Sequence, residues 1–295
     1  MPPRLFRSLC FVPGNNPRFI EKAKSLKVDI VCFDLEDSVP DAQKREARQM
    51  IRQALRDRGS YAAGAVYVRT NSPASGLIPS DLGEVVRRGI DGVVIPKLDN
   101  KAQLKRIVKV LEDLERRRHL GPVGVMPSIE SAEGVVKAYE IASSGGSSRH
   151  SRIDCVIFGV FDLLADMGIE YTAQSDAARY ARARVALDAR AAGVPAIDGI
   201  WQNLKDAKGL ERDCMLGRSL GFAGKSVIHP DQIDTVHRVF HPTRSEVDWA
   251  RKVADAYAKS AAKGRGATAV EGRMIDEVHY KQARAVLDLA ADPAG

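Results

Sequence analysis

Three carboxylates follow directly on an apolar run near the N-terminus, in the stretch 30-IVCFDLEDSVP-40. Residues 30–33 have the composition of a buried strand, whereas Asp34, Glu36 and Asp37 carry charge. A solvated acidic loop needs no apolar segment leading into it. We therefore expect these carboxylates either to cap the helix that follows or to face a positive group, such as a metal ion or an arginine, or a proton that is to be moved.

Polar side chains follow the other apolar runs of the chain in the same way. They are Asn15, Asn16, Arg69, Asn71, Lys97, Ser128, Glu130, Asp162, Asp198 and His229. If the runs are parallel strands of one barrel, their carboxyl ends converge on one mouth. Several carboxylates in one concavity need a cation or protonation to be tolerated, so a metal site is expected there.

Glu130 and Asp162 are the pair that we expect to bind the metal, because they follow adjacent strands. Their hard oxygen atoms suit Mg²⁺, which keeps several waters and takes other ligands from its substrate. A helix-capping or helix-dipole role remains open for both residues, since each precedes a predicted helix. A salt bridge from Arg69 to the acidic stretch, and a helix-start role for His229, are also open.

The rhythm of the chain predicts the elements that hold these residues. Short apolar runs alternate with longer amphipathic ones, and the runs with strand character are 8–12, 29–35, 65–69, 92–96, 123–129, 154–159, 195–200 and 224–229. The clearest helical patterns are 17–26, 44–59, 101–118, 176–193 and 206–221. Eight such alternations predict an α/β fold, a closed parallel (β/α)₈ TIM barrel. A doubly wound open sheet is the alternative, but no GxGxxG follows the first run.

The barrel is expected to close near residue 241, which gives a catalytic domain of residues 1–241. Residues 242–295 then form a C-terminal helical lid extension. Within it, the sequence predicts a helix over 244–264, a Gly-rich connector over 264–272 and a second helix over 273–291.

Composition narrows the class of protein. The chain has 295 residues, a formal net charge of +7 and four cysteines without a CxxC pair. Lys and Arg are spread along the chain, so we expect no nucleic-acid partner, and a phosphate-bearing small ligand accounts for the surplus equally well. Cysteines inside apolar runs indicate buried, reduced thiols, and no stretch has the length of a membrane span. A cytoplasmic protein without a membrane partner is expected.

Several segments in their order resemble one known family, the citrate lyase beta-subunit-like family or HpcH/HpaI aldolase group, with malyl-CoA and citramalyl-CoA lyases most similar in pattern. They are 7-RSLCFVPGNNPRFIEKA-23, 34-DLEDSV-39, 67-YVRTN-71, 128-SIESAEGV-135, 159-GVFDLLADMG-168, 193-GVPAIDGI-200, 224-GKSVIHPDQI-233 and 272-GRMIDEVHYKQA-283. The resemblance implies a Mg²⁺-dependent barrel enzyme with a lid, a homotrimer or hexamer. It implies cleavage of a 3-hydroxyacyl-CoA thioester into acetyl-CoA, or a homologue, and an α-keto acid.

The same resemblance assigns roles to particular residues. Glu130 and Asp162 match the metal ligands, with Glu130 also at the substrate, and Arg69 matches the residue that holds the substrate carboxylate. The positions that match contacts to CoA are Phe11, Arg18, Lys22, Ile228 and His229. Asp276 matches a lid carboxylate that acts as general acid and base in a neighbouring subunit.

The carboxylates of the opening stretch receive different roles in this scheme. Glu36 and Asp37 are expected beside the metal, holding Arg69 and metal-bound waters in place. Asp34 is expected to be structural.

Other functions remain open at this stage. They are a citrate lyase beta subunit acting on a carrier-bound citryl thioester, a malyl-CoA thioesterase, a CoA-independent class II aldolase and a non-catalytic basic binding protein. The aldolase is disfavoured by the lid and by the basic pair Arg18 and Lys22. The basic binding protein predicts salt-sensitive retention on DNA or RNA and no metal dependence.

Overall fold

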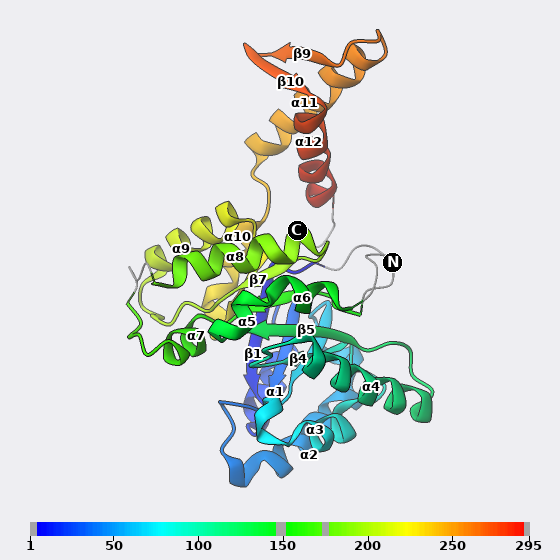
Figure 1. Cartoon of the computed structure of the whole chain (residues 1–295), viewed down its shortest axis with the longest axis vertical. Coiled ribbons are helices and arrows are strands. Elements are labelled where there is room, and N and C mark those ends of the chain that lie inside the picture. Colours follow the sequence, from blue (N-terminus) through cyan, green and yellow to red (C-terminus); the bar gives the residue numbers. More distant parts are fainter. Residues whose placement is uncertain (1–4, 146–151, 173–176, 292–295) are drawn as a thin grey trace. The chain divides into compact units, whose positions relative to one another are not determined.

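The structure, a computed structural model, describes residues 5–145, 152–172 and 177–291 (Figure 1). The described residues fall into two compact units, and the division lies between Val236 and His237. Each unit is therefore described by itself.

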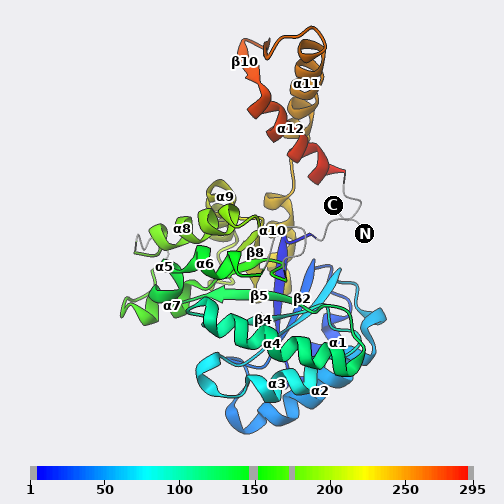
Figure 2. The same ribbon diagram turned by 45° about the vertical axis from the view of Figure 1, so that its right-hand side comes forward.

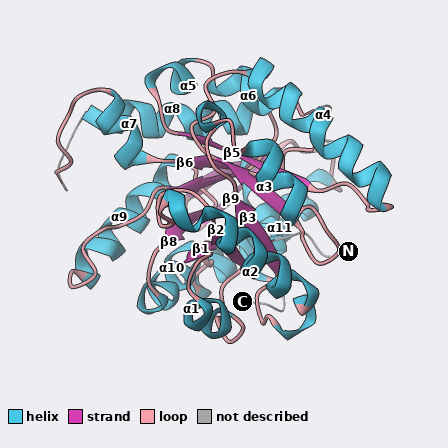
Figure 3. Ribbon diagram, turned by 90° about the horizontal axis from the view of Figure 1, so that it is seen from below, coloured by secondary structure: helices cyan, strands magenta, loops and turns pink. Residues whose placement is uncertain are grey.

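The larger unit is a closed barrel of eight parallel strands in the order β1 to β8, as the sequence predicted (Figure 3). The strands are β1 (Ser8–Pro13), β2 (Ile30–Asp34), β3 (Ala65–Arg69), β4 (Gly92–Ile95), β5 (Gly124–Ile129), β6 (Val156–Phe158), β7 (Ala196–Asp198) and β8 (Gly224–Val227). Pairing of β1 with β8 closes the sheet. The open-sheet alternative is therefore wrong.

Helices surround the barrel and connect its strands (Figures 1 and 2). They are α1 (Pro17–Ala23), α2 (Lys44–Arg56), α3 (Ile78–Val85), α4 (Lys101–Arg118), α5 (Ala132–Val136), α6 (Ala138–Ser143), α7 (Val160–Asp166), α8 (Ala177–Ala191), α9 (Ala207–Leu220) and α10 (Ile233–Phe240). Short 3₁₀ turns are η1 (Asp41–Gln43), η2 (Arg58–Ser60), η3 (Pro73–Ser75) and η4 (Pro230–Gln232). The division between the two units falls inside α10.

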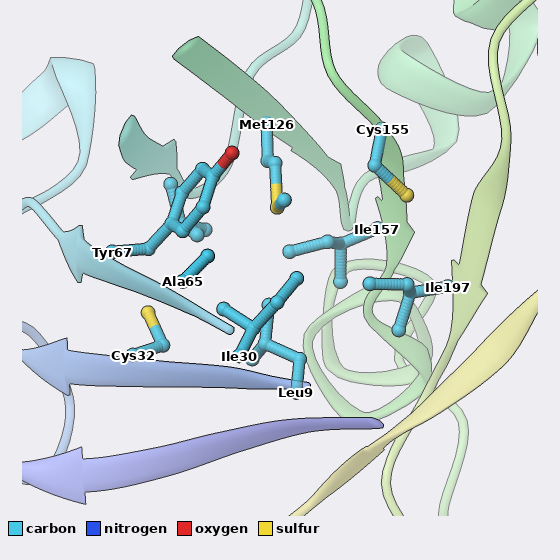
Figure 4. Packing of buried hydrophobic residues seen from close by; sticks show 10 residues of the cluster. Leu9, Ile30, Cys32, Ala65, Tyr67, Met126, Cys155, Ile157 and Ile197 are labelled. Atoms are coloured by element: carbon cyan, nitrogen blue, oxygen red, sulfur yellow. The ribbon is translucent and has the colours of Figure 1, made fainter. Parts of the chain in front are cut away.

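Alternate residues of the strands fill the barrel interior (Figure 4). The buried cluster consists of Leu9, Ile30, Cys32, Ala65, Tyr67, Val94, Met126, Cys155, Ile157 and Ile197. Each large apolar side chain buried in this way stabilises the fold by roughly 1.5–3 kcal/mol. Because strand side chains alternate between two faces, the residues two positions further along β2 and β3, Asp34 and Arg69, also point inward.

The C-terminal unit consists of two helices and a hairpin. Its elements are α11 (Arg244–Ala261), β9 (Ala267–Val270), β10 (Arg273–Asp276) and α12 (Glu277–Ala290). Its small core includes Val253, Ile275 and Ala283, and the rings of Tyr257 and Tyr280 stack at 5.0 Å.

The antiparallel hairpin β9–β10 corrects the prediction of a connector over 264–272 and a helix that starts at 273. Glu271 and Gly272 join the strands with φ angles of 48° and 77°. Two consecutive positive φ angles are typical of the tight turns that match the twist of a hairpin. The side chains of β10 alternate in exposure, since Met274 is 66 % exposed and Ile275 is 1 % exposed.

All four cysteines are buried and free, which confirms the prediction of reduced thiols. Within the described residues, the helices that are long enough to cross a bilayer are too polar to do so.

Candidate active site

Arg69 lies at the carboxyl end of β3 and is held by Asp34 of the neighbouring strand β2. The two residues are directly paired in the strand register. Nε of Arg69 donates to Oδ1 of Asp34 at 2.6 Å and Nη2 donates to Oδ2 at 2.7 Å, which makes a bidentate pair. The guanidinium also lies over the ring of Phe11, 4.7 Å from its centroid. Asp34 therefore fixes the plane of the guanidinium.

Asp34 is 1 % exposed, yet its pKa lies below the ordinary value. Burial acts to raise that pKa, but the charge and hydrogen bonds of Arg69 outweigh burial. Asp34 thus has the structural role that was expected, and this role is to orient Arg69. The sequence had suggested that Glu36 and Asp37 hold Arg69 in place.

Glu36 and Asp37 contact the remaining nitrogen of the same guanidinium. Nη1 of Arg69 lies 3.3 Å from Oε2 of Glu36 and 3.2 Å from Oδ2 of Asp37, so the salt bridge that the sequence left open for Arg69 is present. Burial raises the pKa of Glu36 to about 8 against the opposing charge of Arg69, and the nearby carboxylates of Asp37 and Glu130 add to the rise. Negative charge is therefore crowded at this edge of the barrel.

Lys97, which follows β4, joins three carboxylates of this region. Its Nζ lies 3.0 Å from Oε1 of Glu36, 3.2 Å from Oδ1 of Asp37 and 3.1 Å from Oδ1 of Asp162. Burial acts to lower the pKa of the ammonium, but these contacts raise it above its ordinary value. A single side chain thus connects the acidic stretch after β2 with the helix after β6.

Glu130 follows β5 and is almost completely buried, at 5 % exposure. Its Oε1 accepts a hydrogen bond from Ser128 Oγ, whereas its Oε2 is buried without a hydrogen-bond partner in the described structure. Burial raises the pKa of Glu130 to about 7, and the charge of Asp162 adds to the rise. The capping interpretation is wrong for Glu130, because Ser131 caps α5 by accepting from the amide of Gly134 at 3.0 Å.

Gly159 leaves room for the Glu130 carboxylate. A Cβ atom at Gly159 would lie 2.3 Å from Cγ and 3.0 Å from Oε1 of Glu130, far inside contact distance. The residue between β6 and α7 must therefore lack a side chain for Glu130 to keep this position.

Asp162 lies in the first turn of α7, where its charge is also favourable for the helix dipole. Its side chain is 36 % exposed. Asp162 therefore occupies the helix position that the sequence suggested and at the same time reaches the acidic cluster through Lys97.

These residues surround a cavity of about 460 Å³ at the mouth of the barrel. Of the described residues that line it, four are carboxylates (Asp34, Asp37, Glu130 and Asp162) and one, Arg69, is cationic. The apolar part of the lining includes Ile157, Phe158, Val160, Phe161, Ile200 and Ile228. The cavity thus combines one anchored cation with an excess of carboxylates and an apolar wall.

The donor set fits a hard divalent cation such as Mg²⁺. The unpartnered Oε2 of Glu130 is a buried oxygen that a cation would satisfy, and Asp162 supplies a second carboxylate at the same cavity. The described residues contain no cluster of three or more His, Cys, Asp or Glu side chains arranged to hold a metal. A cation bound by these two carboxylates would therefore take its other ligands from water or substrate, as Mg²⁺ usually does.

A second cavity of about 230 Å³ adjoins the first, and both are lined by Phe11, Pro13 and Ile228. Lys22 and His229 also line this second cavity. Four of the five positions matched to CoA contacts thus surround one hollow. The fifth, Arg18, is exposed on α1, the helix that carries Lys22.

His229 also has the helix-start role that the sequence left open. Its Nδ1 accepts from the amide of Asp231 at 3.2 Å and caps η4.

Asp198 does not point into the mouth, contrary to the expectation for the end of its strand. Ile197 takes the inward position, so the next side chain points outward, where α8 and α9 cover the barrel. There Asp198 forms ion pairs with Arg182 of α8 and with Lys225 of β8, and Asp213 of α9 contacts the same two cations. This buried cluster joins strands to helices.

Asp276 belongs to the C-terminal unit, where it caps α12. Its Oδ1 accepts from the amides of Val278 at 3.0 Å and His279 at 3.3 Å, and lies 2.7 Å from Nδ1 of the His279 ring. Hydrogen bonds from His279 lower the pKa of Asp276. Asp276 therefore caps the N-terminus of α12.

Three residues of the site were not assigned a role from the sequence. Strand alternation placed Ser128 on the same face as Met126 and Glu130, so its position was predictable. The place of Gly159 between a predicted strand and a predicted helix was a weaker indication that it belongs to the site. Nothing in the local sequence indicates that Lys97 spans two loops.

The family model for HpcH/HpaI aldolase/citrate lyase matches residues 7–230 of the chain. The beta subunit of citrate lyase from Leuconostoc mesenteroides subsp. cremoris is 35 % identical over 289 residues, covering 97 % of this chain and 94 % of that protein. A (3S)-malyl-CoA thioesterase from Cereibacter sphaeroides is 31 % identical over 282 residues, covering 96 % and 93 %.

Solved structures of proteins from this family have a similar fold. CitE from Mycobacterium tuberculosis, in complex with magnesium, acetoacetate and coenzyme A, superposes with a TM-score of 0.77 at 28 % identity, covering 98 % of this chain and 99 % of that one. A citrate lyase beta subunit from the same organism, complexed with oxaloacetate and magnesium, gives a TM-score of 0.68 at 27 % identity, covering 82 % and 100 %.

Proposed function

The chain belongs to the HpcH/HpaI aldolase/citrate lyase family, and from this premise we propose that it is a Mg²⁺-dependent carbon–carbon lyase acting on a 3-hydroxyacyl-CoA thioester. The substrate is of the malyl-CoA or citramalyl-CoA type, and the products are acetyl-CoA or a homologue and an α-keto acid. The observation that carries the proposal is the grouping of Glu130, Asp162 and Arg69 around one cavity. A structure of a relative with magnesium and coenzyme A supports it.

In this proposal Glu130 and Asp162 hold the divalent cation. The cation, when bound, supplies Lewis-acid polarisation of oxygen atoms on the acid half of the substrate. Arg69 binds the free carboxylate of that half, and its pair with Asp34 keeps the guanidinium in one orientation. Because Asp34 occupies the Nε–Nη2 edge, the substrate is bound through Nη1, which now contacts Glu36 and Asp37.

The bond that breaks joins the hydroxyl-bearing carbon to the α-carbon of the thioester. Its electron pair becomes the enolate of the departing acyl-CoA, and the hydroxyl carbon becomes the keto carbon as the hydroxyl proton passes to the carboxylate of Asp276. The lowered pKa of Asp276 keeps this carboxylate ionised and able to accept that proton. The enolate must then receive a proton, and we assign that step to Asp276 of a neighbouring subunit in a homotrimer or hexamer. In the reverse direction the same carboxylate removes the proton.

The CoA part of the substrate occupies the second cavity in this scheme. Phe11 and Ile228, which line both cavities, contact the pantetheine chain where it leaves the reaction centre. Lys22, with Arg18 on the same helix, neutralises the phosphates, and His229 lines the same cavity.

The charge of the reaction cavity favours a malyl or citramalyl group over a citryl group. Citryl thioesters carry two free carboxylates, whereas malyl and citramalyl thioesters carry one. Of the described lining residues, Arg69 is the single cation, so the cavity offers one arginine, which matches one substrate carboxylate. The apolar lining at Val160 and Ile200 suits the methyl group of a citramalyl substrate.

Incubation of the protein and Mg²⁺ with malyl-, methylmalyl-, citramalyl- and citryl-CoA tests the proposal, with keto acid and free CoA measured separately. Keto acid from a mono-carboxylate thioester supports the lyase. Free CoA without keto acid would identify a thioesterase, and cleavage of citryl-CoA alone would favour the citrate lyase subunit. Salt-sensitive retention on DNA without any turnover would favour the basic binding protein.

A further inference from the structure

Lys97 occupies an unusual backbone position for a lysine. Its φ angle is +49°, in the left-handed region that residues with a Cβ rarely adopt. Such conformations persist where the surrounding structure holds them, and they are frequent at functional sites. The peptide that follows is fixed, because the amide of Leu98 donates to the carbonyl of Ser128 at 3.3 Å. The loop after β4 is thus tied to β5 directly beside the cavity.

The Lys97 ammonium contacts three carboxylates that come from two separate segments of the chain. Glu36 and Asp37 come from the loop after β2, and Asp162 comes from α7 after β6, all within 3.2 Å of Nζ. Glu36 and Asp37 accept hydrogen bonds from the ammonium at 3.0 and 3.2 Å, and Asp162 forms an ion pair with it at 3.1 Å. A lysine that only faced solvent would not need to contact three carboxylates at once.

The charges around the site explain what this ammonium does. Asp34 is matched by the bidentate contact with Arg69, which leaves Glu36, Asp37, Glu130 and Asp162 to be balanced. Lys97 contacts three of these four. Lys97 therefore keeps the carboxylates close together before any divalent cation binds. It also contacts Oδ1 of Asp162, which is a metal ligand in the proposed function.

We propose that Lys97 is a positioning residue that holds Asp162 and Glu36 in place and, by its positive charge beside Asp162, limits the affinity of the site for the divalent cation. This inference rests on the proposed function. A site held together by a resident ammonium stays folded without metal and binds metal reversibly, because the incoming cation must share Asp162 with an existing positive charge.

Lys97→Met tests this proposal, because methionine keeps the length of the side chain and removes its charge. Isothermal titration with Mg²⁺ in the absence of substrate is expected to show binding that is tighter by about tenfold or more, since one positive charge next to the cation is lost. Thermal unfolding in EDTA should show a lower Tm than the wild type, and Mg²⁺ should raise the Tm of the variant by more than it raises that of the wild type.

Two further variants separate positioning from mere packing. Lys97→Arg retains the charge and is expected to bind Mg²⁺ with wild-type affinity to within about threefold. Lys101→Met is the matched control, because Lys101 pairs with exposed Glu140 at 3.1 Å on the outside of the barrel, and its Mg²⁺ affinity should not change. If Lys97→Met fails to fold, Lys97→Gln in the same titration replaces it.

The outcomes distinguish this inference from the proposed function. Unchanged or weaker Mg²⁺ binding by the charge-removing variants, in a wild type that binds Mg²⁺ and turns over, would overturn the role of Lys97 alone. Failure of the wild type to bind Mg²⁺ at all would overturn both. Tighter binding in Lys97→Met with rescue by Lys97→Arg is the result that supports the proposal.

Discussion

The buried carboxylate of Glu130 is the residue that most clearly indicates a bound cation. Its carboxylate is buried, one of its oxygens has no hydrogen-bond partner in the described structure, and its pKa is raised to about 7 by burial and by Asp162. A buried polar atom without a partner costs about 1–3 kcal/mol. That cost is tolerated where the atom has a ligand to bind, which is why Glu130 is central to the proposed chemistry.

Glu130→Ala and Asp162→Ala should each abolish Mg²⁺ binding and lower turnover by more than about 100-fold, beyond the usual effect of residues that only support a metal ligand. The fold should persist, because barrel stability resides in the interior cluster around Leu9 and Ile157. Titration with Mg²⁺ and circular dichroism check both points.

Asp166→Ala is the control for Asp162, since Asp166 lies one turn further along α7 and accepts from the amide of Ala132. It should retain wild-type Mg²⁺ affinity. Full activity of either site variant in EDTA would rule out the metal proposal.

Arg69→Lys should reduce turnover by roughly 10²–10³-fold, the size seen when one preorganised donor is removed from a charged reaction centre. Lysine keeps the charge but loses the planar fork that Asp34 holds. The affinity for CoA itself should change little, because the CoA contacts lie in the adjoining cavity. Steady-state kinetics and a binding titration with CoA check both points, and Arg52→Lys, at the partly exposed pair with Glu84, serves as control.

Equal weakening of the binding of CoA and of the acid half would contradict the role given to Arg69.

At the scale of elements, strand alternation decides which polar residues reach the site. On β2 and β3 it aims Asp34 and Arg69 inward, and on β7 it aims Asp198 outward. The outward carboxylate, with Arg182, Asp213 and Lys225, forms a charge-balanced cluster between β7, β8, α8 and α9. The cluster fixes the segment in which Gly199 and Ile200 line the reaction cavity.

Asp213→Asn should destabilise the barrel by about 2–3 kcal/mol at neutral pH, less than the roughly 3–5 kcal/mol of a fully buried pair, because this side chain is 19 % exposed. Burial acts to raise the pKa of Asp213, but Lys225 and Arg182 bring it below the ordinary 3.8. The contribution of ionised Asp213 to the free energy of unfolding is therefore complete above pH 3.8. It is lost as the pH falls through the lower pKa that Asp213 has in the folded protein. The difference between variant and wild type should shrink below pH about 4.

Urea unfolding followed by Trp201 fluorescence in a Trp249→Phe background measures this difference for the barrel, since the other tryptophan belongs to the C-terminal unit. Asp113→Asn, at an exposed pair on α4, should change stability by less than about 0.5 kcal/mol. A destabilisation by Asp213→Asn that is constant from pH 7 to pH 3 would contradict the ion-pair explanation.

The sequence predicted most of the barrel, because apolar strand runs and Gly or Pro at junctions are local signals. It also brought Arg69, Glu130 and Asp162 to one mouth by the topology of parallel strands. Alternation within each strand, had it been applied, would have moved Asp198 out and given Asp34 its inward position. The triple contact of Lys97 depends on two loops meeting in space, which no local pattern encodes. The hairpin β9–β10 was missed because its glycines suggested a connector.

At the scale of the whole molecule, the chain combines a barrel that contains the cavity with a C-terminal unit that contains Asp276. Asp276→Asn is the sharpest substitution there, because asparagine can still cap α12 but cannot exchange a proton. We expect cleavage to be lost, with Mg²⁺ and CoA binding almost intact. Asp288→Asn, at an exposed position on the same helix, should keep wild-type turnover.

Subunit exchange extends this test to the assembly. Mixtures of Asp276→Asn and Glu130→Ala proteins should recover part of the activity if the carboxylate acts in a neighbouring subunit. Normal cleavage by Asp276→Asn, or full activity of a chain truncated after residue 243, would show that the C-terminal unit only packs.

We propose that Glu130 and Asp162 hold a divalent cation at which a CoA thioester is split at a carbon–carbon bond. The most direct measurement is the product balance for malyl-CoA and citramalyl-CoA with saturating Mg²⁺, in wild type and in Glu130→Ala. We expect equal amounts of acetyl-CoA and the corresponding keto acid from wild type with one of these thioesters, and neither product from the variant or in EDTA. Cleavage that proceeds unchanged in EDTA, or a wild type that splits neither thioester, would contradict it.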